Sequence, residues 1–130
     1  MRHHGLDGQV RVLRGGDSLF DGARASRLLL AEDRLPTAVI GYNDDVAAGL
    51  VEALARAGVR VPDDLSVVGW DDGALARLPH LDLTSVHQDP VEMSRLAVER
   101  SVARLRGEPV AEREVVLHPE LVVRSSTARR

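Results

Sequence analysis

Polar side chains follow three apolar runs of the sequence, each at the point where the run ends. Asn43 follows one run, Asp71 and Asp72 close the segment SVVGWDD, and Gln88 follows a third run. In open parallel sheets, ligands bind beyond the carboxyl ends of the strands. Carboxylates accept hydrogen bonds from hydroxyl groups, and the amides of Asn and Gln both donate and accept. These residue types predict a site for a polyol or a nucleoside.

The same residues also have structural interpretations. Asn43 is a favoured helix N-cap residue, and Asp-Asp-Gly is ordinary turn chemistry. Trp70 is interpreted as a packing residue at the sheet edge. A further alternative is an α/β enzyme that uses Asp71 and Asp72 as metal ligands or as a phosphoacceptor site. The absence of Lys, and of any positioned nucleophile, gives that alternative no support.

The composition restricts the class of protein. The 130 residues fit one domain, and the net charge of −3, with every basic residue an Arg, gives no electrostatic footprint for nucleic acid. Cys is absent, which excludes thiolate metal sites, and among the His residues only His3 and His4 are close in sequence. We therefore expect no metal and no cofactor. The longest dense apolar run, residues 28–31, is too short to span a bilayer, so we expect a cytoplasmic chain without membrane contact.

Short β-branched runs alternate with amphipathic helical patterns along the chain. This alternation predicts an α/β fold, a parallel sheet with flanking helices. The continuous apolar run at 65–69 predicts a strand that is buried on both faces. We expect strands at residues 10–13, 37–42, 65–69, 83–87, 114–118 and 120–123, and helices at 21–33, from 43 or 44 to 57, and 90–106.

Three long segments carry a resemblance to a known family. They are PTAVIGYNDDVAAGLVEALARAGVRVPDDLSVVGWDD, LTSVHQDPVEMSRLAVERSVARLRG and ELVVRSST, in this order. Together they closely resemble the carboxyl-terminal third of LacI-type transcriptional repressors, the relatives of the lactose and purine repressors. The resemblance implies the carboxyl-terminal lobe of a periplasmic-binding-protein-like (type I) fold, in truncated form. It also implies an effector-binding and dimerisation module without catalysis, which reaches operator DNA only through a domain absent from this chain.

The resemblance also implies roles for individual residues. Asn43, Asp71 and Gln88 would line the cleft that holds a sugar or nucleoside-like effector, and Phe20 is the candidate for an aromatic contact, since Ser18 stands where the family has an aromatic side chain. A homodimer interface would use the exposed side of the second helix and the loop that follows the segment SVVGWDD. The residues expected in that interface are Ala48, Glu52, Leu75, Leu78 and Pro79.

The expected domain organisation follows from the same resemblance. Residues 1–9 would be disordered or irregular, residues 10–127 would form the lobe, and residues 128–130 would be a tail. The helix at 90–106 would belong to the other lobe of the family fold. Because its apolar side chains favour burial, we expect it to fold back on its own domain or to dock onto a second copy. The alternative from the same fold, a fragment of a sugar-binding transport protein, is disfavoured by the lack of a signal peptide at the start of the sequence.

Overall fold

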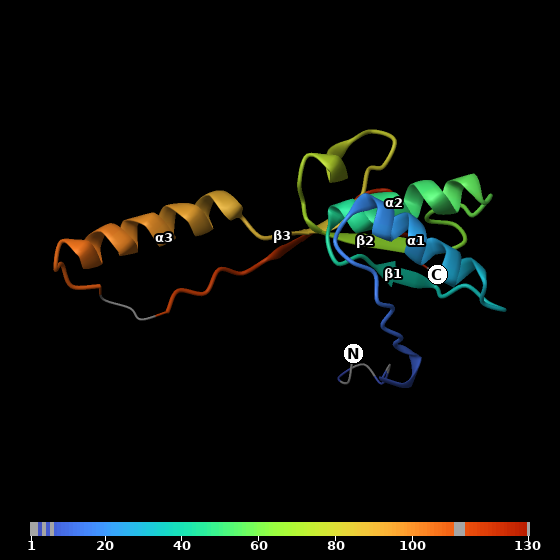
Figure 1. Ribbon diagram of the computed structural model, residues 1–130, viewed down its shortest axis with the longest axis horizontal. Coiled ribbons are helices and arrows are strands. Elements are labelled where there is room, and N and C mark those ends of the chain that lie inside the picture. Colours follow the sequence, from blue (N-terminus) through green and yellow to red (C-terminus); the bar gives the residue numbers. More distant parts are fainter. Residues whose placement is uncertain (1–2, 4, 6, 111–113, 130) are drawn as a thin grey trace.

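The computed structural model describes residues 3, 5, 7–110 and 114–129, and these residues contain one four-stranded sheet (Figure 1). The strands lie in chain order: β1 (Ala38–Ile40), β2 (Ser66–Asp71), β3 (Thr84–His87) and β4 (Glu120–Val122). β1, β2 and β3 run parallel, and β4 pairs with β3 in the antiparallel direction. The predicted α/β class with a parallel sheet is confirmed.

Two helices cover one face of this sheet. α1 (Leu19–Leu30) packs on α2 (Asp44–Arg56), and α2 lies against β2. Two short 3-10 turns, η2 (Asp7–Gln9) and η3 (Leu75–Arg77), lie outside the helices. The apolar core forms between the helices and the sheet, and its buried members are Ala25, Leu29, Ala47, Leu50, Leu54, Leu65, Val67, Ala76 and Leu83.

The second face of the sheet is exposed toward the edge strands, whereas the central run 65–69 is buried or half-buried on both faces, as expected. Ile40 on β1 is 62% exposed and Leu121 on β4 is 59% exposed. Trp70, Val86 and Leu121 stand in one row across β2, β3 and β4, so they share this face. Among the described residues, the flanking helices α1 and α2 cover only the opposite face.

Local capping explains where the helices begin. Ser18 and Asp21 form a capping box at the start of α1, which therefore begins two residues before the predicted position. Asn43 is the N-cap of α2, as predicted, and its Oδ1 accepts the Val46 N–H. Asp89 caps α3 (Pro90–Leu105) with Pro90 in the first turn, which confirms the predicted start of this helix.

Two predicted strands are wrong. Residues 10–13 and 114–118 have no strand pairing, although both are rich in β-branched residues. Strand propensity alone does not form a strand, because the backbone N–H and C=O groups need a neighbouring strand as their hydrogen-bond partner. The expectation for residues 1–9 and the proposed tail lie partly outside the described residues, which exclude 1, 2, 4, 6 and 130.

α3 does not fold back on the sheet, so that part of its expected packing is wrong. Figure 1 shows α3 projecting away from α1, α2 and the sheet, and none of its residues is buried. β3 leads into α3 almost directly, because Asp89 adopts a left-handed conformation with φ of 48° and the helix begins at the next residue. This short connection directs α3 away from the body of the protein.

Two glycines allow α1 and α2 to approach closely. A methyl group at Gly22 would overlap the Val46 carbonyl oxygen, and one at Gly49 would overlap the Leu19 carbonyl oxygen. Each helix therefore presents a glycine to the backbone of the other. The contact brings α1 against the first turn of α2, which carries Asn43 as its cap.

We predict that Gly49→Ala destabilises the fold by about 1–3 kcal/mol, the usual cost of overpacking, because the two helices would have to separate. Urea unfolding followed by circular dichroism measures this change. Gly15→Ala is the matched control, since a methyl group there meets no atom within 4 Å. Equal midpoints for the two variants would show that the helix contact tolerates a side chain.

Candidate effector-binding site

The three polar residues predicted to converge do line one cavity. Asn43 at the start of α2, Asp71 at the end of β2 and Gln88 after β3 surround a cavity of about 450 Å³, together with Tyr42 and Trp70. The parallel pairing of β2 and β3 places Asp71 beside His87, so Gln88 emerges next to the same strand end. Gln88 Nε2 donates to Asp71 Oδ1 at 3.0 Å.

The amide of Asn43 has a structural role as well as a place in the cavity. Oδ1 accepts the Val46 N–H at 2.8 Å, and Nδ2 donates to the Asp17 carbonyl oxygen at 2.8 Å. The predicted capping role is therefore confirmed. An Asn side chain has two donors and two acceptor lone pairs, so these two bonds leave one of each for a ligand.

Asp71 combines backbone strain with an unusual electrostatic environment. Its φ of 110° and the φ of 51° at Asp72 lie where residues other than Gly are rare. Such conformations persist only where surrounding contacts enforce them, and they concentrate at functional sites. Burial raises the pKa of the Asp71 carboxyl, the negative charges of Asp44 and Asp45 raise it further, and the Gln88 hydrogen bond lowers it in part.

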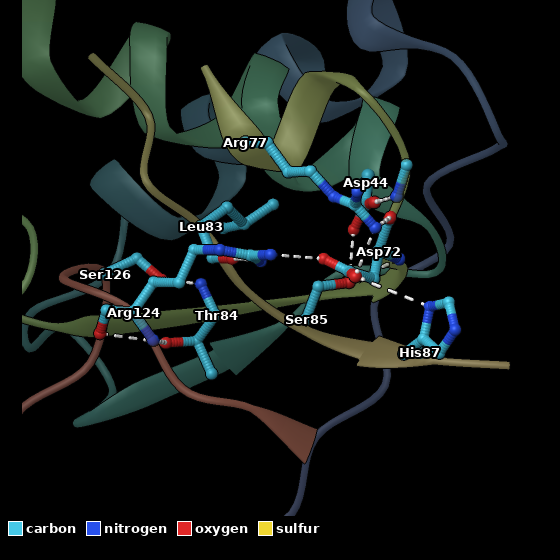
Figure 2. A network of polar contacts seen from close by, with 10 residues as sticks. Asp44, Asp72, Arg77, Leu83, Thr84, Ser85, His87, Arg124 and Ser126 are labelled. Carbon is cyan, nitrogen blue, oxygen red and sulfur yellow. Dashed lines mark hydrogen bonds and ion pairs between the residues drawn. The ribbon is translucent and has the colours of Figure 1, made fainter. Parts of the chain in front are cut away.

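Asp72 is not among the residues that line the cavity, and its carboxylate lies in a network of polar contacts (Figure 2). Arg124 Nη2 donates to Asp72 Oδ1 at 2.6 Å, and Arg77 Nη2 donates to Oδ2 at 2.8 Å. His87 Nδ1 lies 3.4 Å from the same Oδ2. Arg124 Nη1 also donates to the Leu83 carbonyl oxygen at 2.7 Å, so this one side chain joins the segment after β4 to the end of β2 and to the residue before β3.

A second buried carboxylate, Asp44, lies on the other side of the same turn. Its Oδ1 accepts the Ser85 hydroxyl at 2.6 Å, and its Oδ2 accepts the Gly73 N–H at 2.7 Å. Ser85 Oγ in turn accepts the Asp72 N–H at 3.0 Å. Gly69 makes room for this carboxylate, because a methyl group there would overlap Asp44 Oδ1.

These contacts separate the roles of the two adjacent aspartates. Burial of Asp72 would raise the pKa of its carboxyl, but the hydrogen bonds from Arg124 and Arg77 outweigh burial and hold the pKa below its usual value. Both Asp72 oxygens are held by arginines, so Asp71 and Asp72 do not form the pair that a metal or phosphoacceptor site requires. Within the described part of the chain, no three metal-ligating side chains lie close enough together to hold an ion.

The other predicted site residues lie apart from the cavity. Phe20, in the first turn of α1, is 84% exposed and is not among the residues that line it. The expectation that Ala48 lies on an exposed face of α2 is wrong, because Ala48 is completely buried. α2 is enclosed on more sides than an amphipathic surface helix, since α1 and β2 both pack on it. Glu52, Leu75, Leu78 and Pro79 are partly or fully exposed.

Several residues of the site were not predicted from the sequence. Tyr42 and Trp70 line the cavity, although Trp70 was interpreted as a packing residue. Each directly precedes a predicted polar residue at a strand end, and this adjacency in sequence could have indicated that the aromatic side chains line the same cavity. Trp70 and Gln88 also border a second cavity of about 350 Å³ beneath α3. Arg124 lies 52 residues from Asp72 in sequence, and no local pattern indicates their contact.

Arg124→Met is predicted to reduce the free energy of unfolding at neutral pH by about 3–5 kcal/mol, because it leaves the buried Asp72 carboxylate without its main partner. The Asp72 pKa is lowered on folding, so its stabilisation is full above the ordinary value of 3.8 and is lost as the pH falls through the folded value. The difference between wild type and variant should therefore shrink below pH 3.8. Urea titrations at several pH values, followed by the fluorescence of the single Trp, measure it.

Arg77→Met is the matched control for this measurement. The Arg77 side chain is 59% exposed whereas that of Arg124 is 15% exposed. An exposed ion pair is typically worth only about 0–1 kcal/mol. Similar losses for both variants, or a loss for Arg124→Met that does not change with pH, would contradict the assigned role of Arg124.

Comparison with known proteins identifies the family of this fold. A periplasmic binding protein-like domain family matches residues 1–127. The transcriptional repressor PurR of Pasteurella multocida is 39% identical over 120 residues, which are 92% of this chain and 36% of that protein. The chain thus spans about a third of the length of this relative. The relatives are transcriptional repressors and not enzymes, which agrees with the expectation that this chain is not an enzyme.

Solved structures give the same result. A LacI transcriptional regulator from a Rhodococcus species has a TM-score of 0.89 and 40% identity, and the match covers 97% of this chain and 46% of that one. A LacI family regulator from Enterococcus faecalis with bound ribose has a TM-score of 0.83 and 26% identity, covering 92% and 44%. None of the helices described here is long and apolar enough to cross a membrane. The chain belongs to the periplasmic binding protein-like domain family, in the form found in LacI-type transcriptional regulators.

Proposed function

We propose that this chain is an effector-binding part of a LacI-type transcriptional regulator, and that its effector is a neutral hydroxylated molecule such as a sugar or a nucleoside. The observation that carries the proposal is the cavity at the carboxyl ends of the parallel strands. Asn43, Asp71 and Gln88 reach it from three different elements, and one element alone could not place all three. The bound ribose in the Enterococcus faecalis regulator is consistent with this ligand class.

The composition of the cavity favours this class of ligand. Asp71 accepts hydrogen bonds, while Asn43 and Gln88 donate and accept, which suits neighbouring hydroxyl groups. Tyr42 and Trp70 add aromatic surface, against which the apolar face of a sugar ring or a base can pack. The negative charges that raise the Asp71 pKa oppose phosphorylated ligands. The effector is therefore an unphosphorylated donor of several hydrogen bonds.

The regulatory role places the chain in a larger assembly. Its net charge of −3 gives no electrostatic footprint for binding phosphates, so we assign contact with operator DNA to a different domain of the regulator. The fold of a sugar-binding transport protein is similar, but the relatives that support the assignment are regulators. A cytoplasmic location follows from this role.

We predict that the chain binds ribose and adenosine only at millimolar level or worse, because its cavity has walls from one lobe alone. A full-length regulator should bind far more tightly, and there Asp71→Ala should weaken the binding by about 1.5–3 kcal/mol, the range for hydrogen bonds to a charged group. Ribose 5-phosphate should bind more weakly than ribose. NMR titration of the amide signals of residues 42, 43, 70, 71 and 88 measures these affinities.

Asp33→Ala is the control for this titration, since Asp33 is exposed and does not line the cavity. It should leave the ribose affinity unchanged. Micromolar binding by the chain would contradict the incomplete cavity, and ribose shifts confined to residues far from the strand ends would contradict the site itself.

We also propose that the chain forms a homodimer through Glu52 on α2 and the loop residues Leu75, Leu78 and Pro79. Leu78 and Pro79 leave apolar surface exposed beside η3, and η3 packs against α2. A twofold contact brings the same patch of both copies together, so one inserted charge acts twice. Ala48 is excluded from this patch by its burial.

Leu78→Arg is predicted to shift the chain from dimer to monomer in sedimentation velocity experiments, because two like charges would meet across the twofold axis. Val12→Arg is the matched control, since Val12 is 89% exposed and lies outside the patch. A dimer that survives Leu78→Arg places the interface elsewhere, and a wild-type chain that sediments as a monomer contradicts self-association.

A further inference from the structure

We infer that Asp44 is a positioning residue for the effector site, which holds Asp71 and Asn43 in place and keeps the cavity negatively charged without lining it. This inference rests on the proposed effector site. Asp44 is only 5% exposed and is absent from the residues that line the cavity. It nevertheless follows Asn43 directly in the chain, and its carboxylate reaches the turn that carries Asp71.

The hydrogen bonds of Asp44 connect the two ligand-facing residues through buried atoms. One oxygen accepts the Gly73 N–H, which fixes the backbone two residues after Asp71. The other oxygen accepts the Ser85 hydroxyl, which itself accepts the Asp72 N–H. The strained turn at Asp71 and Asp72 is therefore held from the first turn of α2. Since Asn43 caps that helix, a single carboxylate determines the separation of Asn43 and Asp71.

Asp44 also acts on Asp71 through its charge. The pKa of Asp71 is raised first by burial, then by the negative charge of Asp44 and, to a smaller extent, by that of Asp45. The cations near the turn, Arg77 and Arg124, are engaged with Asp72. The remaining titratable group beside the turn is His87, whose Nδ1 lies next to Asp72. Of the two charges that raise the Asp71 pKa, that of Asp44 has the larger effect and belongs to a buried side chain.

Helix geometry makes this buried carboxylate tolerable. Asp44 occupies the first turn of α2, where the helix dipole favours a negative charge. Gly69 lacks the side chain that would otherwise fill the space of its carboxylate. Two hydrogen bonds and the helix dipole therefore offset its desolvation. The burial of the Asp44 carboxylate despite its desolvation cost, next to the strained turn at Asp71 and Asp72, supports a role for Asp44 in the site.

The variant Asp44→Asn removes the negative charge of Asp44 while it keeps a side chain of nearly the same shape. The Asn oxygen can still accept the Gly73 N–H, and the new amide can donate to the Ser85 hydroxyl, which has two acceptor lone pairs. The turn can therefore persist while one negative charge is lost. Asp45→Asn is the matched control, because it removes the adjacent, exposed charge without touching Gly73 or Ser85. Ser85→Ala is the complementary variant, since it breaks the network but keeps both charges.

The experiment is an NMR pH titration of the Asp71 carboxyl carbon in the four proteins. In wild type, the Asp71 pKa should lie above 3.8. Asp44→Asn should lower it by clearly more than Asp45→Asn does, and Ser85→Ala should keep it raised while the Gly73 and Asp72 amide signals move. Equal shifts from Asp44→Asn and Asp45→Asn would overturn the inference. If Asp44→Asn fails to fold, a wild-type value at or below 3.8, or unmoved amide signals in Ser85→Ala, would overturn it.

Ribose titrations at several pH values separate this inference from the proposed function. Binding that depends on ionised Asp71 should persist to lower pH in Asp44→Asn than in wild type, because the lower pKa keeps Asp71 ionised. Ribose binding whose pH profile is the same in both proteins overturns the inference and leaves the site intact. Ribose and adenosine that shift only amide signals far from the strand ends, together with the expected pKa shifts, contradict the proposed function and leave the link between Asp44 and Asp71 standing.

Discussion

The carboxylates of Asp44 and Asp72 are both buried at the carboxyl end of the sheet. Each requires hydrogen-bond donors that offset its loss of hydration. Asp72 obtains them from Arg77 and Arg124, and Asp44 obtains them from Ser85 and Gly73. These requirements draw the segment after β4, the start of α2, the end of β2 and the first residues of β3 together. The cavity lies at this point because its three polar side chains are attached to the elements that the buried charges hold in place.

Regular elements with strong local signals were predictable from the sequence. Alternating patterns gave the parallel sheet and its helices, and capping chemistry located the starts of α2 and α3. The rule that strand ends meet in a parallel sheet was sufficient to bring Asn43, Asp71 and Gln88 together. The different environments of Asp71, which lines the cavity, and Asp72, which pairs with arginines, were not predictable. Positive φ angles at both residues interrupt the alternation of side chains that a strand would impose.

Interactions between distant residues account for the remaining differences. The strand expected at 10–13 has the right composition, but composition does not supply a neighbour for pairing. Ala48 belongs to a helical pattern that is amphipathic in sequence, yet the glycine contact between α1 and α2 encloses it. The exposure of Ile40 and Leu121 on the edge strands cannot be read from the sequence either, because an apolar strand residue has the same identity whether or not a layer covers it.

The hydrogen bond from Gln88 to Asp71 uses part of the hydrogen-bonding capacity of the cavity. Because this bond already gives the carboxylate a donor, a ligand hydroxyl that takes its place exchanges one hydrogen bond for another and gains little enthalpy from that contact alone. A solute with a single donor has little advantage over water under these conditions. Discrimination then depends on how many of the cavity's polar groups one molecule engages simultaneously, which favours rigid rings that carry several hydroxyls in a fixed arrangement over flexible alcohols of the same composition.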